Sequence, residues 1–203
     1  EVISIAYNIY QMFGIKELSI KINTLGSNNV REKYVSDLKK SLSKFKTIFN
    51  ENEYIRLEKN TLRILDSKNK DIKELTRKHA PNIIDYISND DRQHFMKVLN
   101  ILDAMEIPYL HDNHLVRGLD YYNRTVFEVI SKKLGGQDAL CGGGRYDNLI
   151  NQLGGSNIPA MGFAAGMERL LLSMDLEDNQ NTQTDIYIIN LEEDLINHSM
   201  KLA

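Results

Sequence analysis

The feature that most constrains the fold is a pair of β-type segments separated by a glycine-rich turn. Residues 125–130 are rich in β-branched and aromatic side chains, and residues 139–141 follow a turn at 134–137. This pattern predicts an antiparallel hairpin. Apolar residues also alternate with polar ones over residues 18–22, which predicts another half-buried strand. The chain should therefore contain a sheet with at least one face packed inward.

Helical periodicity surrounds these strands. Apolar residues recur at helical spacing over residues 2–13, and Gly14 is placed to end that helix. A similar stripe runs over residues 29–49, and another over residues 71–105, broken by Pro81. Strands and helices in this arrangement indicate an α/β (α+β) fold, in which flanking helices cover an antiparallel sheet.

Changes of pattern divide the chain into a core segment, a mainly helical middle part, a second core segment and a terminal part. We expect these to be residues 1–27, 28–113, 114–175 and 176–203. Within the helical part, residues 57–65 could hold a short strand or an extended segment. In the terminal part, a polar linker precedes an apolar run at 185–190, which reads as a buried strand that begins a further βα unit.

Composition excludes several classes of protein. At 203 residues, 42% hydrophobic and with a net charge of -3, the chain is long and apolar enough for a globular core and has no global attraction for nucleic acid. Its single cysteine, Cys141, excludes an internal disulfide and a cysteine zinc site, and fits a cytoplasmic protein. No apolar run has membrane-spanning length. His111 and His114 match no metal-ligand spacing, so we expect no protein metal site. The chain begins at Glu1 inside a helical pattern, and we expect it to be a piece of a longer protein.

The first cluster with chemical potential is residues 115–122, LVRGLDYY in one-letter code, directly before the first strand of the hairpin. Arg117 supplies a cation, Gly118 permits close approach of the backbone, and two adjacent tyrosines supply flat rings with hydroxyl groups. This combination fits a site for a small polar ligand. It equally fits a surface turn in which Tyr121 and Tyr122 lie on opposite faces of a sheet.

A second cluster, residues 142–147 (GGGRYD), ends the second strand of the hairpin. Three glycines let a backbone approach a ligand closely, or they form a flexible turn into a short helix at 148–153. Cys141 precedes them among apolar neighbours, which favours a core residue over a nucleophile.

The third cluster is residues 161–170, MGFAAGMERL. Gly162, Ala164 and Gly166 are small at alternate positions, which would keep one face open for a flat or phosphorylated ligand. Tight packing of a helix needs the same small residues. No Rossmann or P-loop spacing is present.

Taken together, the three clusters closely resemble histidyl-tRNA synthetases. Residues 115–122 and 143–147 look like the histidine-specific motifs of that family, and residues 162–170 look like the third signature motif of class II aminoacyl-tRNA synthetases. Residues 23–27 and 62–68 are similar to segments at the start of, and within, the family's insertion domain. The resemblance covers nearly the whole chain. It implies part of the class II antiparallel sheet, with the helical middle part as the insertion domain and the start of an anticodon-binding domain after it.

The resemblance also implies roles for charged residues. Arg117 would lie beside the histidine carboxylate and the α-phosphate of ATP, where a fixed guanidinium stabilises extra negative charge. Arg169 would be the second catalytic arginine, stacking on adenine or reaching the γ-phosphate, and Glu168 would belong to the same ATP site. Glu128 would bind Mg²⁺ or simply occupy a place in the sheet.

The pocket for the imidazole ring would be formed by aromatic residues and glycines. Tyr121, Tyr122 and Tyr146 would line it, with hydroxyl groups able to serve either ring nitrogen. Gly143 and Gly144 would let the sheet floor approach the ligand.

The implied activity is that of a histidine–tRNA ligase, which activates histidine with ATP and magnesium and transfers it to the 3′ end of tRNA(His). The implied protein is a cytoplasmic homodimer that does not enter a membrane. The family's first and second motifs are absent from these 203 residues, so we expect the chain alone to be inactive. The alternative is a non-catalytic histidine-binding relative, such as a regulatory subunit of ATP phosphoribosyltransferase or a sensor domain.

Overall fold

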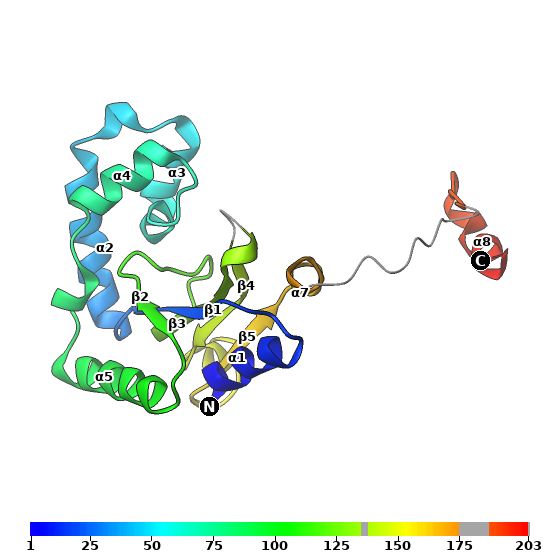
Figure 1. The fold of residues 1–203 in the computed structure, drawn as a ribbon. Coiled ribbons are helices and arrows are strands. Elements are labelled where there is room, and N and C mark those ends of the chain that lie inside the picture. Colours follow the sequence, from blue (N-terminus) through cyan, green and yellow to red (C-terminus); the bar gives the residue numbers. More distant parts are fainter. Residues whose placement is uncertain (135–137, 175–186, 203) are drawn as a thin grey trace.

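The computed structural model describes residues 1–134, 138–174 and 187–202, and a mixed sheet forms its centre (Figure 1). Within the described residues the sheet has five strands in the order β2-β1-β3-β4-β5. Their bounds in chain order are β1 Leu18–Thr24, β2 Tyr109–His111, β3 Asn123–Ser131, β4 Ala139–Arg145 and β5 Met161–Ala165. Only the β1–β2 pair is parallel among these. The predicted hairpin is confirmed as β3 and β4, while most of its predicted turn, residues 135–137, lies outside the described residues.

Helices and short 3-10 turns connect the strands. The α-helices are α1 Val2–Met12, α2 Asn28–Ser43, α3 Glu51–Lys59, α4 Lys70–His79, α5 Asn89–Ala104, α6 Leu149–Gln152, α7 Met167–Ser173 and α8 Ile196–Leu202. The 3-10 turns are η1 Lys46–Ile48, η2 Thr61–Ile64, η3 Ile83–Asp85, η4 Lys132–Leu134 and η5 Glu193–Leu195. Helix α1 ends at Met12 with Phe13 as its C-cap, and Gly14 follows with φ +72°, which confirms the predicted stop.

The expectation of a strand or extended segment at 57–65 was wrong, because α3 and η2 occupy these residues. A reciprocal capping box starts α3: the Asn50 side chain accepts from the Glu53 amide at 2.9 Å, and the Glu53 carboxylate accepts from the Asn50 amide at 3.0 Å. Leu57 and Leu62 then point into a core. Local capping and burial therefore decide the helical state.

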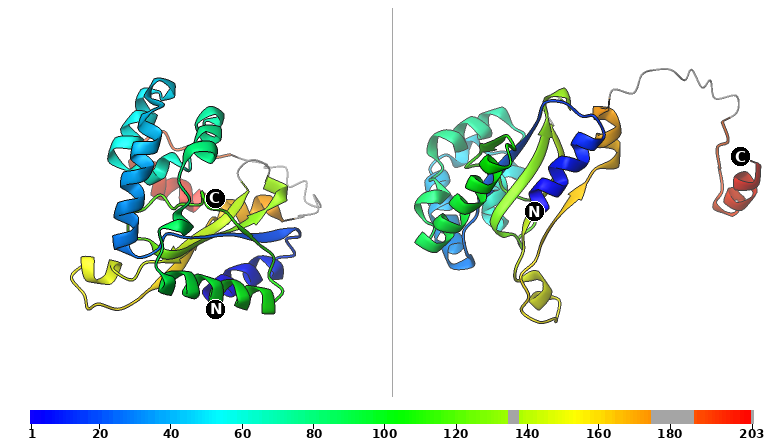
Figure 2. Two further views of the ribbon diagram at one scale, coloured as in Figure 1. Left: turned by 90° about the vertical axis from the view of Figure 1, so that its left-hand side faces the viewer. Right: turned by 60° about the horizontal axis from the view of Figure 1, so that its bottom comes forward.

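One face of the sheet is covered by α1 and α5, which lie together on the same side (Figure 2, left). Residues from both helices and from β1, β3 and β4 form one apolar cluster. Its largest fully buried side chains are Tyr10, Ile20, Ile22, Phe95 and Phe127. Cys141 is buried in this cluster, which confirms its expected place in the core. We call the opposite side of the sheet the site face.

Helices α2, α3 and α4, with η1 and η2, stand on the side of the site face and are called the helical subdomain here (Figures 1 and 2). Their apolar side chains form a second cluster that includes Tyr34, Leu38, Leu57 and Ile72. The same cluster reaches Val126 of β3. Apolar packing therefore joins the helical subdomain to the sheet.

Helix α5 and strand β2 belong to the middle part of the chain but pack with the sheet. Phe95 and Leu102 of α5 enter the first cluster, and β2 pairs with β1 through Ile20 and Tyr109. Both elements therefore lie with the sheet and not with α2–α4. The four domain limits expected from the sequence stay a prediction.

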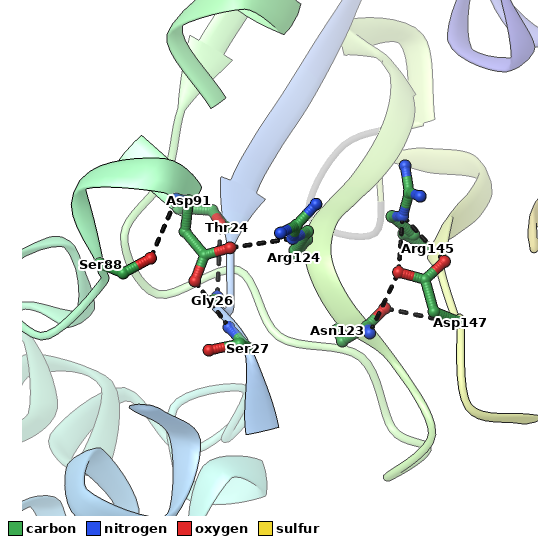
Figure 3. A network of polar contacts seen from close by, with 9 residues as sticks. All are labelled: Thr24, Gly26, Ser27, Ser88, Asp91, Asn123, Arg124, Arg145 and Asp147. Carbon is green, nitrogen blue, oxygen red and sulfur yellow. Dashed lines mark hydrogen bonds and ion pairs between the residues drawn. The ribbon is translucent and has the colours of Figure 1, made fainter. Parts of the chain in front are cut away.

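A buried carboxylate ties α5 to the sheet (Figure 3). Asp91, only 2% exposed, accepts from Arg124 Nε at 2.9 Å and from the Ser27 amide at 3.1 Å. Its own amide donates to Ser88 Oγ, the N-cap of α5. Arg124 has φ +47° at an irregularity of β3, where its amide donates to Gly26. One side chain thus links α5, the start of α2 and the start of β3.

The terminal part is described only for residues 187–202, and the predicted linker at 175–184 lies outside the described residues. Of the predicted strand at 185–190, the described part is not a strand, and Tyr187 is 82% exposed. None of the described strands pairs with it, and a strand needs such a partner for its backbone groups. Beyond it, η5 and α8 have no buried residue.

Candidate active site

A row of four residues crosses the site face through the strand register. Lys21 pairs with Glu128, Glu128 with Gly142, and Gly142 with Ala164, so all four point to the same side. Two charged residues therefore lie beside two of the smallest residues. The small pair leaves the sheet backbone open to a ligand.

A cleft of about 1100 Å³ lies over this row. Its walls come from the sheet, from the loop that precedes β3, from α4 with the segment before it, and from α7. Charged residues among its lining are Lys21, Asp66, Lys68, Lys73, Arg77, Asp112, Arg117, Glu128, Asp138 and Arg169. Because both signs are present, the cleft can bind a ligand that carries both anionic and cationic groups.

The Arg117 guanidinium lies directly over Gly142. A Cβ atom at position 142 would lie 2.5 Å from Arg117 Cζ, so the guanidinium can occupy this position only because residue 142 is glycine. Arg117 Nη1 donates to Glu128 Oε1 at 2.6 Å. Its Nε atom is buried and has no hydrogen-bond partner among the described residues. The guanidinium thus retains a donor that a ligand could satisfy.

Burial disfavours the charged form of the carboxyl groups around Arg117. It raises the pKa of Glu128 and of Asp66, and in both cases the Arg117 charge opposes the rise. On the far side of the row, Lys21 Nζ forms an ion pair with Asp138 at 2.8 Å. An anionic ligand in the cleft would therefore compete with Glu128 for the Arg117 guanidinium.

Three tyrosine rings form an aromatic cluster beside Arg117. The Tyr121 and Tyr122 ring centroids are 4.6 Å apart, and the Tyr146 ring meets both edge-on at 5.7 and 6.0 Å. A Cβ at Gly144 would lie 2.9 Å from the Tyr122 ring, so this glycine makes room for the cluster. Burial, with a contribution from Tyr121, raises the pKa of Tyr122 to about 12. Its hydroxyl therefore stays a hydrogen-bond donor at neutral pH.

The structure thus brings Arg117 and the three predicted tyrosines together on one face. Residues 120–121 do form a turn into β3, but Tyr121 and Tyr122 do not lie on opposite faces of a sheet, because both precede β3 and their rings are in contact. Glu128 lies in the floor beside them.

The other predicted residues are placed differently. Arg169 of α7 lines the cleft and donates to the Ala139 carbonyl at 2.8 Å. Glu168 is exposed and is not among the described lining of the cleft. A side chain at Gly143 would meet Phe163 Cβ at 2.6 Å, away from the site face.

The sequence placed Gly142 in the second cluster without assigning it a role in the site, and Lys21 and Asp66 were not predicted as parts of it. Strand alternation from Glu128 could have identified Gly142 and Lys21 once the register was known. For Asp66 no local signal exists, because the loop between η2 and α4 reaches the cleft only through tertiary packing.

Replacement of Gly142 by alanine should separate function from stability. The new methyl group would displace Arg117, a flexible side-chain end, whereas alanine suits a strand better than glycine. We expect the thermal midpoint to stay within about 3 °C of the parent and ligand-dependent activity of the full-length protein to fall about 100-fold. Gly144→Ala is the contrast, because its Cβ would lie 2.7 Å from the Thr125 carbonyl and should destabilise the chain. Full activity of the Gly142→Ala variant would contradict the assignment of Arg117.

Comparisons with known proteins place the chain in one family. A family model described as histidyl-tRNA synthetase matches residues 1–170. A histidine–tRNA ligase of Prochlorococcus marinus is 43% identical over 190 residues, which are 94% of this chain and 44% of the relative. One from Ruthia magnifica is 40% identical over 205 residues and covers 100% of this chain, which spans 48% of that relative. The crystal structure of apo S. aureus histidyl-tRNA synthetase has a TM-score of 0.65 and 32% identity, covering 99% of this chain and 50% of that one.

The antiparallel core with an arginine over a glycine floor is thus the core of a class II synthetase fold. The chain belongs to the histidyl-tRNA synthetase family. It spans about half the length of the curated relatives it matches.

Proposed function

We propose that the full-length protein activates histidine with ATP and transfers it to the 3′ end of tRNA(His). This chain would contribute one wall of that site. The observation that carries the proposal is the Arg117 guanidinium, which lies on bare sheet backbone, beside a tyrosine cluster, in a chain of this family.

Each group has a role that fits its surroundings. Arg117 would bind the histidine carboxylate and the α-phosphate, because its buried Nε still needs an acceptor and its Nη1 can leave Glu128. Tyr121, Tyr122 and Tyr146 would line the imidazole pocket and donate hydroxyl hydrogen bonds. No protein nucleophile is needed, since positioning and charge stabilisation account for most of the catalysis of such transfers.

The nucleotide would lie along the site face toward α7. Arg169 would contact the adenine or the γ-phosphate, with Glu168 in the same ATP site, and Gly143 and Gly144 would belong to the floor of the histidine pocket. No group of three or more His, Cys, Asp or Glu side chains within the described ranges could hold a metal ion. Mg²⁺ would be held largely by ATP phosphates, as is usual for this ion, with Glu128, the carboxylate bonded to Arg117, on the same face of the sheet.

The test is histidine-dependent ATP–pyrophosphate exchange, followed by charging of tRNA(His). We expect exchange from the full-length parent and none from the 203-residue chain, because the remaining wall of the site would come from other parts of the protein. Pyrophosphate exchange by the isolated 203-residue chain would refute the proposal that it holds only one wall of the site. A parent that binds histidine but does not bind ATP would instead be the regulatory or sensor relative.

The setting of the protein is also proposed. A cytoplasmic homodimer fits the family and the single buried cysteine. Across the ranges that the structure covers, no helix is both long and apolar enough to cross a membrane.

A further inference from the structure

The loop that carries Arg117 has little secondary structure of its own, yet its backbone is held by side chains from far away in the sequence. This loop, residues 115–122, lies between β2 and β3. At its start, Asn23 Nδ2 donates to the Leu115 carbonyl at 3.0 Å. Among the described residues, the other side-chain hydrogen bonds to its backbone come from Arg31 and Arg63 of the helical subdomain, so the orientation of the loop depends on a neighbouring unit of the fold.

Arg63 of η2 holds the residue directly after Arg117. Its Nε donates to the Gly118 carbonyl at 2.9 Å, and its Nη2 donates to the same oxygen. A Cβ at position 118 would lie 3.2 Å from Arg63 Nη2, so glycine permits this close approach. Two donors on one carbonyl fix the peptide next to the Arg117 side chain.

Arg31 of α2 holds the other end of the loop. Its Nη1 donates to the Asp120 carbonyl and, at 3.3 Å, to the Tyr122 carbonyl. Its Nη2 forms an ion pair with the Asp120 carboxylate at 2.9 Å, and Asn60 donates to that carboxylate at 3.1 Å. The helical subdomain thus contacts the backbone on either side of Tyr121.

These bonds differ in weight. The Asp120 side chain is 72% exposed, so its ion pair is screened by water and contributes little. The Arg31 side chain is only 18% exposed, and its bonds to carbonyl groups are charge-assisted. The Arg31 bonds to carbonyl groups are therefore the better shielded ones, whereas Arg63 is exposed and constrains the loop by placing two donors on one carbonyl.

We propose that the helical subdomain sets the geometry of the histidine pocket through Arg31 and Arg63, which act as positioning residues and touch no substrate. The proposal rests on the proposed function for the identity of the ligand. It makes occupancy of the pocket by histidine depend on the packing of α2 and η2 against the Arg117 loop.

The test uses the full-length protein with Arg31→Met, Arg63→Met and the double variant, since methionine keeps most of the aliphatic stem. We expect the double variant to raise the KM for histidine about tenfold, as loss of charged hydrogen bonds to the loop would. The KM for ATP should rise by less than the KM for histidine, because Arg169 on α7, the other proposed ATP contact, is untouched. Arg63→Lys should recover part of the loss, since one ammonium group can still reach the Gly118 carbonyl.

The matched control is Arg92→Met, which removes a 2.7 Å bond from an arginine to the Ile84 carbonyl far from the loop. It should leave the KM for histidine unchanged. An unchanged KM in the double variant, or an equal effect of Arg92→Met, would overturn the proposal. Hydrogen exchange of amides 117–122 is a readout without catalysis and should accelerate only in the loop variants. A parent without pyrophosphate-exchange activity, in which the hydrogen exchange of the loop amides still accelerates in the Arg31 and Arg63 variants, would refute the proposed function alone.

Discussion

Replacing Arg117 with methionine in the full-length protein should lower histidine-dependent pyrophosphate exchange about 10³-fold. The guanidinium is the group placed to stabilise charge on both reacting partners. In comparable sites, removal of one such fixed donor lowers kcat roughly 10²–10³-fold. Arg117→Lys should retain charge without the planar fork and fall between the parent and Arg117→Met. Exchange within about tenfold of the parent for Arg117→Met would contradict the proposed role.

A double variant separates the chemistry from folding. Arg117→Met leaves the Glu128 carboxylate partly buried without its 2.6 Å partner, so the pKa of Glu128 should rise further. Adding Glu128→Gln removes that uncompensated charge and should restore stability without restoring exchange. Recovery of exchange in the double variant would show that Arg117 acts only through the fold.

Replacing Asp91 with alanine should destabilise the 203-residue chain by about 3 kcal/mol. Asp91 is 2% exposed, and its removal leaves the Ser27 amide without its acceptor and Arg124 without its carboxylate. Breaking a buried pair costs roughly 3–5 kcal/mol, and we take the low end because Arg124 is partly exposed. The change is measured as the free energy of unfolding in urea.

Asp120→Ala is the matched control for this experiment. Asp120 also forms an ion pair with an arginine, Arg31, but its side chain is exposed to solvent. Its replacement should therefore lower the free energy of unfolding by less than about 1 kcal/mol. Similar losses for Asp91→Ala and Asp120→Ala would contradict the view that buried Asp91 links α5 to the start of α2 and to β3.

Local sequence patterns already determined much of this protein. Alternation placed β1, the mixed β-branched and aromatic run placed β3, and Gly14 ended α1, because each signal depends on neighbours in the chain. Three separate clusters also pointed to the family. Each was ambiguous alone, and their order and spacing removed the ambiguity.

Tertiary structure decided what those patterns left open. Which glycine faces Arg117 depends on the phase of the strand pleat, and the register shows that it is Gly142 and not Gly143. The approach of Arg63 to Gly118 spans 55 positions of the chain, so no local pattern predicts it. The sequence by itself determined the family and most of the helices and strands, since these follow from motifs and short-range periodicity. Only the fold decided which side chains share the cleft, because that depends on packing between distant segments.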